Sequence, residues 1–196
     1  MPAIARSLTA PAPMLLPLRL LAGMSLICLM GLLSPLRAAA LEDFIGTYSG
    51  WAEVENASGE MSLRDLSVVF SAQQRDNFTL TWKTVSYRSD GRVKDISYTI
   101  DFVPSDRDGV YAAAMGTNVF GHSVQLDPMK GDPYVWAQLQ GKTLTVYSMF
   151  IGEQGGYEMQ EYRRTLVEGG LELEFRRFRN GKKMKTVEAF LARQKQ

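Results

Sequence analysis

The fold can be predicted from one stretch, Phe78-Thr79-Leu80-Thr81-Trp82-Lys83, in which large apolar residues alternate with polar ones. In an extended strand successive side chains point to opposite faces, so Phe78, Leu80 and Trp82 share one face. The aromatic and β-branched residues of the stretch suit a pleated, half-buried surface. The six residues therefore predict a β-strand with one face in a core and the other face in water.

The same alternation recurs throughout the chain from residue 41 onward, and short turns separate the alternating runs. Asn180-Gly181 and Asp90-Gly91 are strong hairpin motifs, because both central residues of a type I′ turn need positive φ. Gly141-Lys142, Gly155-Gly156 and Gly169-Gly170 punctuate the other runs. The pattern predicts about ten strands, near residues 44–55, 62–73, 77–87, 91–102, 109–115, 133–140, 143–151, 157–167, 170–179 and 184–193.

The order of these elements predicts the fold class. No segment has a convincing helical stripe; the best candidate, 187–193, fits a final strand equally well. A long antiparallel sheet tends to curl or close, because closure removes its exposed edges. We therefore predict an all-β fold, either an antiparallel up-and-down barrel or a strongly curved meander of about ten strands. The longest irregular stretch, Gly116 to Asp132, is expected to be a loop.

Residues 1–40 differ in composition from the rest of the chain. They contain no Asp or Glu, only three arginines, an apolar run over 20–33 and the small residues Ala38-Ala39-Ala40. This order is typical of a secretory signal peptide cleaved before Leu41, which predicts a periplasmic or secreted protein. The alternative is an uncleaved anchor, but that usually needs about 20 apolar residues and this run is shorter. We thus expect a signal peptide at 1–40 and a single β-barrel domain at 41–196.

The mature composition excludes several classes of protein. Without its three leader arginines the chain keeps 19 of its 22 basic residues against 21 acidic ones, so its net charge is about −2. This balance does not suggest nucleic acid as a partner. The only cysteine, Cys28, leaves with the leader, so disulfides are excluded. Charged residues such as Lys83, Asp101, Glu172 and Glu174 interrupt the strands, so we expect no stable membrane insertion of the mature domain.

The segment from Phe44 to Trp51, Phe-Ile-Gly-Thr-Tyr-Ser-Gly-Trp, resembles the first strand of the calycin superfamily, which includes lipocalins, fatty-acid-binding proteins and nitrobindin-like barrels. Gly46 and Tyr48 occupy the glycine and aromatic positions of that strand, and Gly50 matches the nitrobindin-like start. Tyr162-Arg163-Arg164 and Leu171-Glu172-Leu173 resemble the late strands of such barrels, where an arginine often packs across the opening aromatic residue. The resemblance implies a barrel with an interior cavity.

The chain also departs from these families. Lipocalins commonly add a C-terminal helix, and none is visible here. Nitrobindin-like proteins bind haem through a histidine near the C-terminus, whereas the only histidine of this chain is His122, in the long loop. The resemblance therefore does not imply haem binding.

Catalytic and metal-binding motifs are not recognisable. His122 lacks the second histidine or mature cysteine that metal sites usually recruit, and its neighbour Ser123 does not make a catalytic triad. Asp106 and Asp108 supply too few oxygen ligands for a calcium loop. We predict no metal site, no cofactor and no catalytic residue, and we do not assign an enzymatic activity.

Aromatic and basic residues give two candidate ligand features. The aromatic set could line a cavity or equally fill the barrel core; it comprises Trp51, Trp82, Tyr98, Tyr134, Trp136 and Tyr162. Arg164 shares a strand face with Tyr162, and Arg177 shares one with Phe175, so an interior guanidinium could grip a carboxylate. Alternatively, Arg177 and the basic residues around Asn180-Gly181 form a solvated hairpin tip.

Two functions are favoured over a third, an isomerase or cyclase that needs few titratable groups. The first is an exported, lipocalin-like barrel that binds a small lipophilic or carboxylate ligand. Its candidate ligand-binding residues are Trp82, Tyr98, Trp136, Tyr162, Arg164 and Arg177. The alternative is an envelope protein–protein interaction module, or an exported inhibitor, with a filled barrel.

Overall fold

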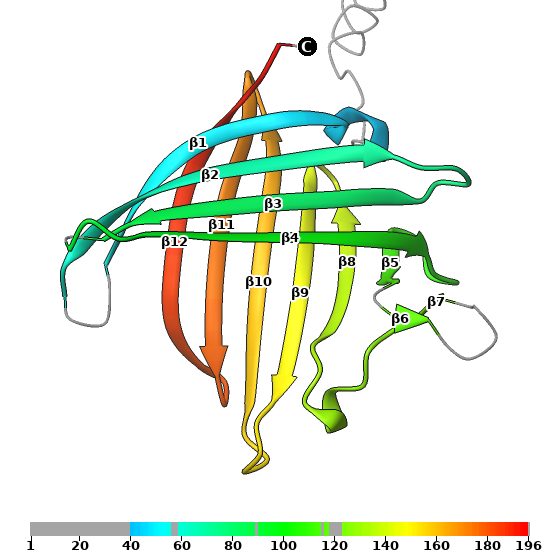
Figure 1. The fold of residues 1–196 in the computed structure, drawn as a ribbon. Coiled ribbons are helices and arrows are strands. Elements are labelled where there is room, and N and C mark those ends of the chain that lie inside the picture. Colours follow the sequence, from blue (N-terminus) through cyan, green and yellow to red (C-terminus); the bar gives the residue numbers. More distant parts are fainter. Residues whose placement is uncertain (1–39, 56–58, 89, 115, 118–122, 196) are drawn as a thin grey trace, which may run out of the picture. The chain divides into compact units, whose positions relative to one another are not determined.

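The computed structural model describes residues 40–195, with gaps at 56–58, 89, 115 and 118–122 (Figure 1). The predicted signal peptide, apart from Ala40, and His122 lie outside the described residues. No helix in the described part of the chain is long and apolar enough to cross a bilayer. The elements are η2 (Leu41–Phe44), β1 (Gly46–Glu55), β2 (Met61–Ala72), β3 (Phe78–Tyr87), β4 (Val93–Pro104), β5 (Val110–Ala113), β6 (Gly116–Thr117), β7 (Ser123–Val124), η3 (Pro128–Lys130), β8 (Tyr134–Gln140), β9 (Thr143–Ile151), β10 (Tyr157–Val167), β11 (Gly170–Arg179) and β12 (Lys182–Arg193).

Ten of these strands form a closed antiparallel barrel in the order β1-β12-β11-β10-β9-β8-β5-β4-β3-β2. The predicted all-β barrel of about ten strands is thereby confirmed. One prediction needs correction: residues 116–132 are not wholly irregular, because β6 pairs with β7 and η3 follows them.

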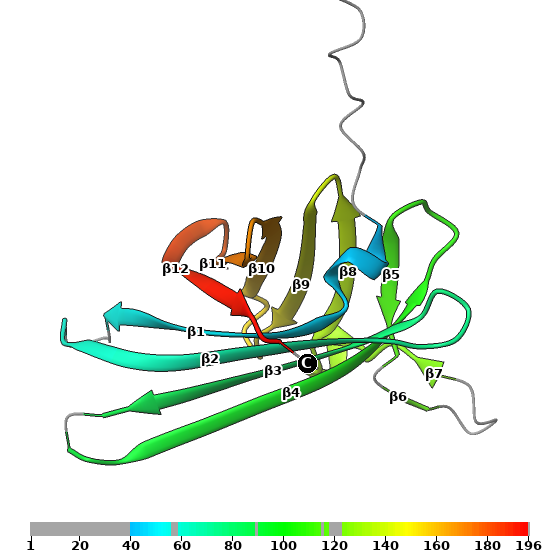
Figure 2. The same ribbon diagram turned by 90° about the horizontal axis from the view of Figure 1, so that it is seen from above.

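The barrel consists of two sheets that cross steeply. In Figures 1 and 2 strands β1–β4 run across strands β8–β12, and the sheets meet at two corners. At one corner β1 and β12 pair only over Tyr48–Gly50 and Leu191–Arg193. A Cβ at Gly50 would lie 2.2 Å from the carbonyl oxygen of Phe190, so only glycine fits this corner. At the other corner the short strand β5 pairs through three residues with each of its neighbours.

The hairpin between β11 and β12 confirms the turn prediction. Asn180 and Gly181 have φ values of 49° and 78° and separate the paired residues Arg179 and Lys182. Positive φ at both central residues matches the twist of the flanking strands. The register of the turn extends to the pair Phe178 and Lys183, and a bulge between Arg177 and Phe178 shifts the pairing over the rest of β11 and β12.

One end of the barrel is closed and filled. Tyr48 is fully buried, and its hydroxyl donates to the carbonyl oxygen of Phe44, 2.8 Å away. The Arg193 guanidinium lies 5.2 Å from the centre of the Tyr48 ring, and its Nε donates to the hydroxyl at 3.1 Å. This corrects the expectation that the arginine across the opening aromatic residue comes from Tyr162-Arg163-Arg164. The buried aromatic residues Phe44, Phe70, Phe78 and Phe102 and the leucines Leu80, Leu144, Leu171 and Leu191 fill this half of the lumen.

Candidate ligand site in the barrel lumen

The period-two alternation places a stripe of polar and aromatic side chains on the inner faces of β10 and β11. Register pairs Tyr162 with Phe175 and Arg164 with Leu173. The buried residues Arg164 and Leu173 show that this face points into the barrel. Tyr162 and Arg164 therefore share an inward face, as their spacing predicts.

Beyond the filled end the lumen contains a cavity of about 200 Å³. Four of the six predicted ligand-binding residues line it, namely Trp82, Tyr98, Tyr162 and Arg164. The rings of Trp82 and Tyr162 lie 5.5 Å apart, centre to centre. The lumen is thus filled in one half and hollow in the other, so each of the two alternatives left open by the sequence applies to part of it.

Arg164 is the most unusual residue of this cavity. Its side chain is 1% exposed, and its guanidinium lies 5.4 Å from the centre of the Trp82 ring and 5.7 Å from that of Tyr162. Its Nη1 donates a long hydrogen bond of 3.4 Å to the carbonyl oxygen of Tyr162, and its buried Nε has no partner. None of the ion pairs among the described residues includes Arg164.

This environment is unfavourable for a cation. Burial lowers the pKa of Arg164 from 12.5 to about 10, and the neighbouring Tyr162 offsets only part of that effect. At neutral pH the side chain still carries its charge, since a pKa of about 10 lies well above 7. A desolvated charge without a counterion is costly to folding and marks a candidate binding site.

Tyr162 begins a hydrogen-bonded chain that runs along β10. Burial raises the pKa of Tyr162 to about 12, so its hydroxyl stays protonated and donates to Oε1 of Gln160 at 2.8 Å. Nε2 of Gln160 in turn donates to Oε1 of Glu158 at 2.9 Å. The polar groups beside the cavity are therefore bonded to one another, whereas Arg164 is left with the single long bond.

Arg177 belongs to the same set of hydrogen-bonded side chains, so its guanidinium is already engaged within the protein. Its Nε and Nη2 donate to the two carboxylate oxygens of Glu158 at 2.7 and 2.6 Å, and Nη2 of Arg179 adds a third bond at 3.3 Å. Burial alone would raise the pKa of Glu158, but the bonds from Arg177 and Gln160 outweigh it and the pKa is lowered. Arg177 does not line the cavity, and its bidentate site is occupied by Glu158, so its predicted role as a ligand partner stays a prediction.

Trp136 also departs from expectation. The buried residues Val135 and Ala137 take the inward positions of β8, so Trp136 points outward. Its ring stacks on that of Tyr147 at 4.9 Å and 14°. Trp136 therefore cannot line the lumen, and neither can Trp51, which is 62% exposed and does not border the cavity.

Two basic residues near the cavity were not predicted. Arg64 lines it, its Nε is buried without a partner, and burial lowers its pKa. Nζ of Lys185 donates to the carbonyl oxygen of Glu55 at 3.0 Å. Burial, followed by the charges of Arg64 and Arg177, lowers the pKa of Lys185. The alternation of Arg64 with Leu66 and Val68 could have revealed its inward direction.

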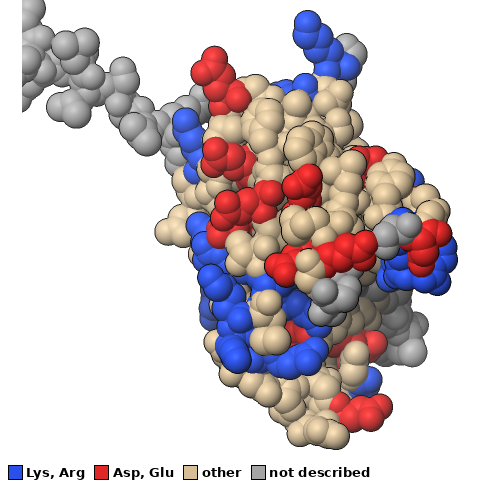
Figure 3. Space-filling view, turned by 90° about the vertical axis from the view of Figure 1, so that its left-hand side faces the viewer, with Lys and Arg blue, Asp and Glu red and all other residues tan. Residues whose placement is uncertain are grey.

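The surface charge is unevenly distributed on the side of the barrel where β1 connects to β2 and β3 connects to β4, which is the left-hand side of Figure 1. Figure 3 shows Lys and Arg gathered in the lower part of this view and Asp and Glu mostly above them. The cavity itself is lined by Arg64, Lys83 and Arg164 and by no acidic residue, so the lumen favours anions over cations. No cluster of three or more His, Cys, Asp or Glu that could hold a metal occurs among the described residues.

The fold and site thus define a closed antiparallel β-barrel with a basic, aromatic lumen. No family model matches the sequence, and no curated protein matches it. Among solved structures, the S-type phycobiliprotein lyase CPES from Guillardia theta is similar to the chain with a TM-score of 0.34 and 8% sequence identity, over 80% of this chain and 91% of that chain.

Proposed function

We propose that the barrel binds a small aromatic or lipophilic carboxylate in its lumen and that Arg164 is the partner of the carboxylate. The observation that carries this proposal is the buried guanidinium of Arg164, which has no counterion among the described residues. An arginine can hold a carboxylate through two parallel hydrogen bonds. The bound anion would supply the charge that the protein itself does not place beside Arg164.

The size of the cavity narrows the class of ligand. A cavity of about 150 Å³ in another protein takes up benzene, and this lumen offers about 200 Å³. One aromatic ring with a short carboxylate arm fits that volume, whereas a long acyl chain would have to extend through the mouth. The walls of Trp82, Tyr98, Tyr162 and Phe175 suit a ring, because aromatic side chains pair edge to face or offset.

A matched pair of ligands tests the proposal. Cinnamate and cinnamyl alcohol have the same ring and arm, but only cinnamate has a carboxylate. Hydrogen bonds to charged groups are worth about 1.5–3 kcal/mol, so we expect calorimetry to show at least about tenfold tighter binding of cinnamate. Equal affinities for the two compounds, or no binding of either, would refute the proposal.

A matched pair of variants locates the ligand. Arg164→Met should abolish the preference for cinnamate, because the anion loses its partner. Arg163→Met is the control: the adjacent residue has a 42% exposed side chain, and its Nε lies 3.6 Å from Oε2 of Glu174. Loss of the preference in both variants, or in neither, would place the binding site elsewhere.

We also propose that the protein is exported and that its barrel is of the calycin type. Export is supported by the leader composition of residues 1–40, and the calycin type by Gly46, Tyr48 and Gly50 at the start of the barrel. Purification from separated cell fractions followed by N-terminal sequencing tests export, with Leu41 as the expected first residue. The alternative of an interaction module with a filled barrel is less well supported, because part of the lumen is hollow.

A further inference from the structure

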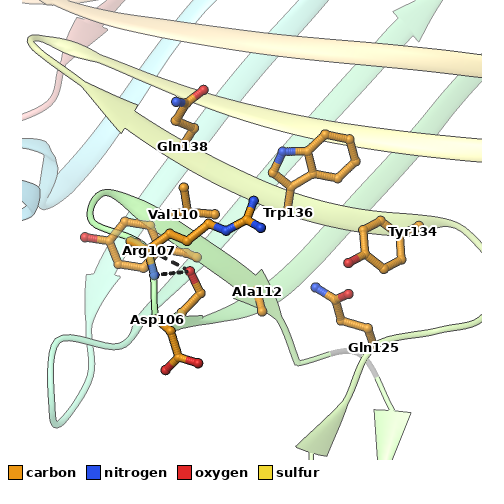
Figure 4. Close-up of a pocket in the computed structure, with 10 residues that line it drawn as sticks. Asp106, Arg107, Val110, Ala112, Gln125, Tyr134, Trp136 and Gln138 are labelled. Carbon is orange, nitrogen blue, oxygen red and sulfur yellow. Dashed lines mark hydrogen bonds between the residues drawn. The ribbon is translucent and has the colours of Figure 1, made fainter.

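A second hollow lies on the outer surface, at the corner where β5 joins the two sheets. It has a volume of about 600 Å³ and shares no lining residue with the lumen cavity. Its walls come from the β4–β5 connection, β5 and β8 (Figure 4). We call it the β5 groove, and the residues that define its chemistry are Arg107, Ala112, Gln125, Tyr134, Trp136 and Gln138.

The indole ring of Trp136 lines the β5 groove and packs against two neighbouring aromatic rings. Trp136 lies between Tyr147 of β9 and Ala112 of β5 in the strand register. Tyr147 covers the first face of the ring by stacking at 4.9 Å. The ring of Tyr134 lies at a tilt, 5.7 Å from the indole centre to centre, and the small side chain of Ala112 lines the groove on the β5 side. Trp136, Tyr134 and Ala112 therefore give the groove an aromatic, apolar wall.

Polar side chains surround this wall. Figure 4 shows the Arg107 side chain extending toward Trp136, whereas Asp106, which also lines the groove, directs its carboxylate away from Trp136. Arg107 is exposed and takes part in none of the ion pairs that join described residues. Gln125 is held in place because its Nε2 donates to the carbonyl oxygen of Val135 at 3.2 Å, and no described residue bonds to its amide oxygen. Gln138 adds a second amide, with both donor and acceptor atoms.

We propose that the β5 groove binds an oligosaccharide that carries a carboxylate, such as one built of uronic acid units. The C–H face of a pyranose ring packs on a flat aromatic wall, and amide groups bond to neighbouring hydroxyls as both donors and acceptors. The Arg107 guanidinium matches the planar carboxylate of a uronic acid. The volume of about 600 Å³ lies within the range of about 300–1,000 Å³ found for small-molecule sites. A purely apolar ligand would leave the two amides and the guanidinium without partners.

Trigalacturonic acid and its trimethyl ester are suitable probes, because they share one carbohydrate skeleton and differ in charge. Calorimetry at millimolar ligand should show binding of the acid, with the ester at least fivefold weaker. Arg107→Gln should bind the acid as weakly as the wild-type protein binds the ester. No binding of the acid, or equal binding of acid and ester by the wild-type protein, would overturn the proposal.

Two further variants test the location. Ala112→Leu extends a side chain into the groove, and Trp136→Ala removes its wall, so both should abolish binding of the acid. The control Trp51→Ala removes an exposed tryptophan that does not line the groove, and its binding should equal that of the wild-type protein. Retained binding in Ala112→Leu would contradict the proposal, as would loss in Arg164→Met, which alters only the lumen. Circular dichroism of each variant distinguishes lost binding from lost folding.

Discussion

Arg164→Met should make the unliganded protein more stable while it removes binding of the carboxylate. The pKa of Arg164 falls from 12.5 to about 10 because burial disfavours the charged form. Each pKa unit corresponds to about 1.4 kcal/mol, so the buried charge destabilises the fold by about 3 kcal/mol at neutral pH. Because the folded-state pKa lies below the unfolded value, this cost is fully present below pH 10 and disappears as the pH rises toward 12.5.

The substitution also removes favourable contacts. The guanidinium lies over the rings of Trp82 and Tyr162, and such contacts together are worth about 1–2 kcal/mol. Methionine keeps a long apolar side chain in the site and leaves no polar atom unpaired. The expected net gain is about 1–2 kcal/mol, which corresponds to a rise in Tm of roughly 2–8 °C for a domain of this size.

Urea denaturation and thermal melts of the mature protein, followed by circular dichroism, measure this effect. Arg163→Met serves as the control, because an exposed ion pair contributes about 0–1 kcal/mol and its loss should change stability little. A fall in the free energy of unfolding of more than about 1 kcal/mol for Arg164→Met would mean that Arg164 stabilises the fold. The interpretation of Arg164 as a ligand partner would then be refuted.

Two further predictions concern the corner of the barrel at Gly50 and the hydrogen bonds of Glu158. Gly50→Ala places a Cβ 2.2 Å from the Phe190 carbonyl oxygen, so urea denaturation should show a free energy of unfolding lower by about 2–3 kcal/mol. The control Gly152→Ala, whose Cβ would lie 3.5 Å from its nearest neighbour, should lower it by about 1 kcal/mol or less. Similar losses of stability in both variants would contradict the corner geometry. The lowered pKa of Glu158 means that its bonds stabilise the fold above its ordinary pKa of 4.5 and that this contribution is lost as the pH falls below 4.5. In urea denaturation at a series of pH values from neutral to acidic, the free energy of unfolding should therefore fall less steeply for Glu158→Gln than for the wild-type protein. Parallel curves of this free energy against pH would contradict the prediction.

The barrel could be predicted from sequence because short stretches of sequence specify its strands and its turns. Alternation of the kind seen over 78–83 specifies a strand and its buried face, and Asn180-Gly181 specifies a tight hairpin. The same local rule predicted the inward direction of Arg164, since it shares parity with Tyr162. Closure of the sheet followed from the number of strands, because an open sheet of that length would leave long exposed edges.

The pairing of inward side chains could not be predicted in the same way. Arg177 and Arg164 both face inward, and only the register of β10 against β11 brings Glu158 within reach of Arg177. The prediction that Trp136 lines the lumen was wrong for another reason. Trp136 was chosen because it is aromatic, although the apolar residues Val135 and Ala137 on either side of it already indicated which positions of its strand point inward. Phase along the strand, rather than residue type, decides which aromatic residues line a barrel.

The most direct test of the central claim is a crystal structure of the mature protein with 4-bromocinnamate, in which the anomalous signal of bromine locates the ligand. We expect the bromine within the lumen and the carboxylate within hydrogen-bonding distance of the Arg164 guanidinium. A ligand bound only outside the lumen, or a lumen ligand whose carboxylate does not contact Arg164, would contradict the account.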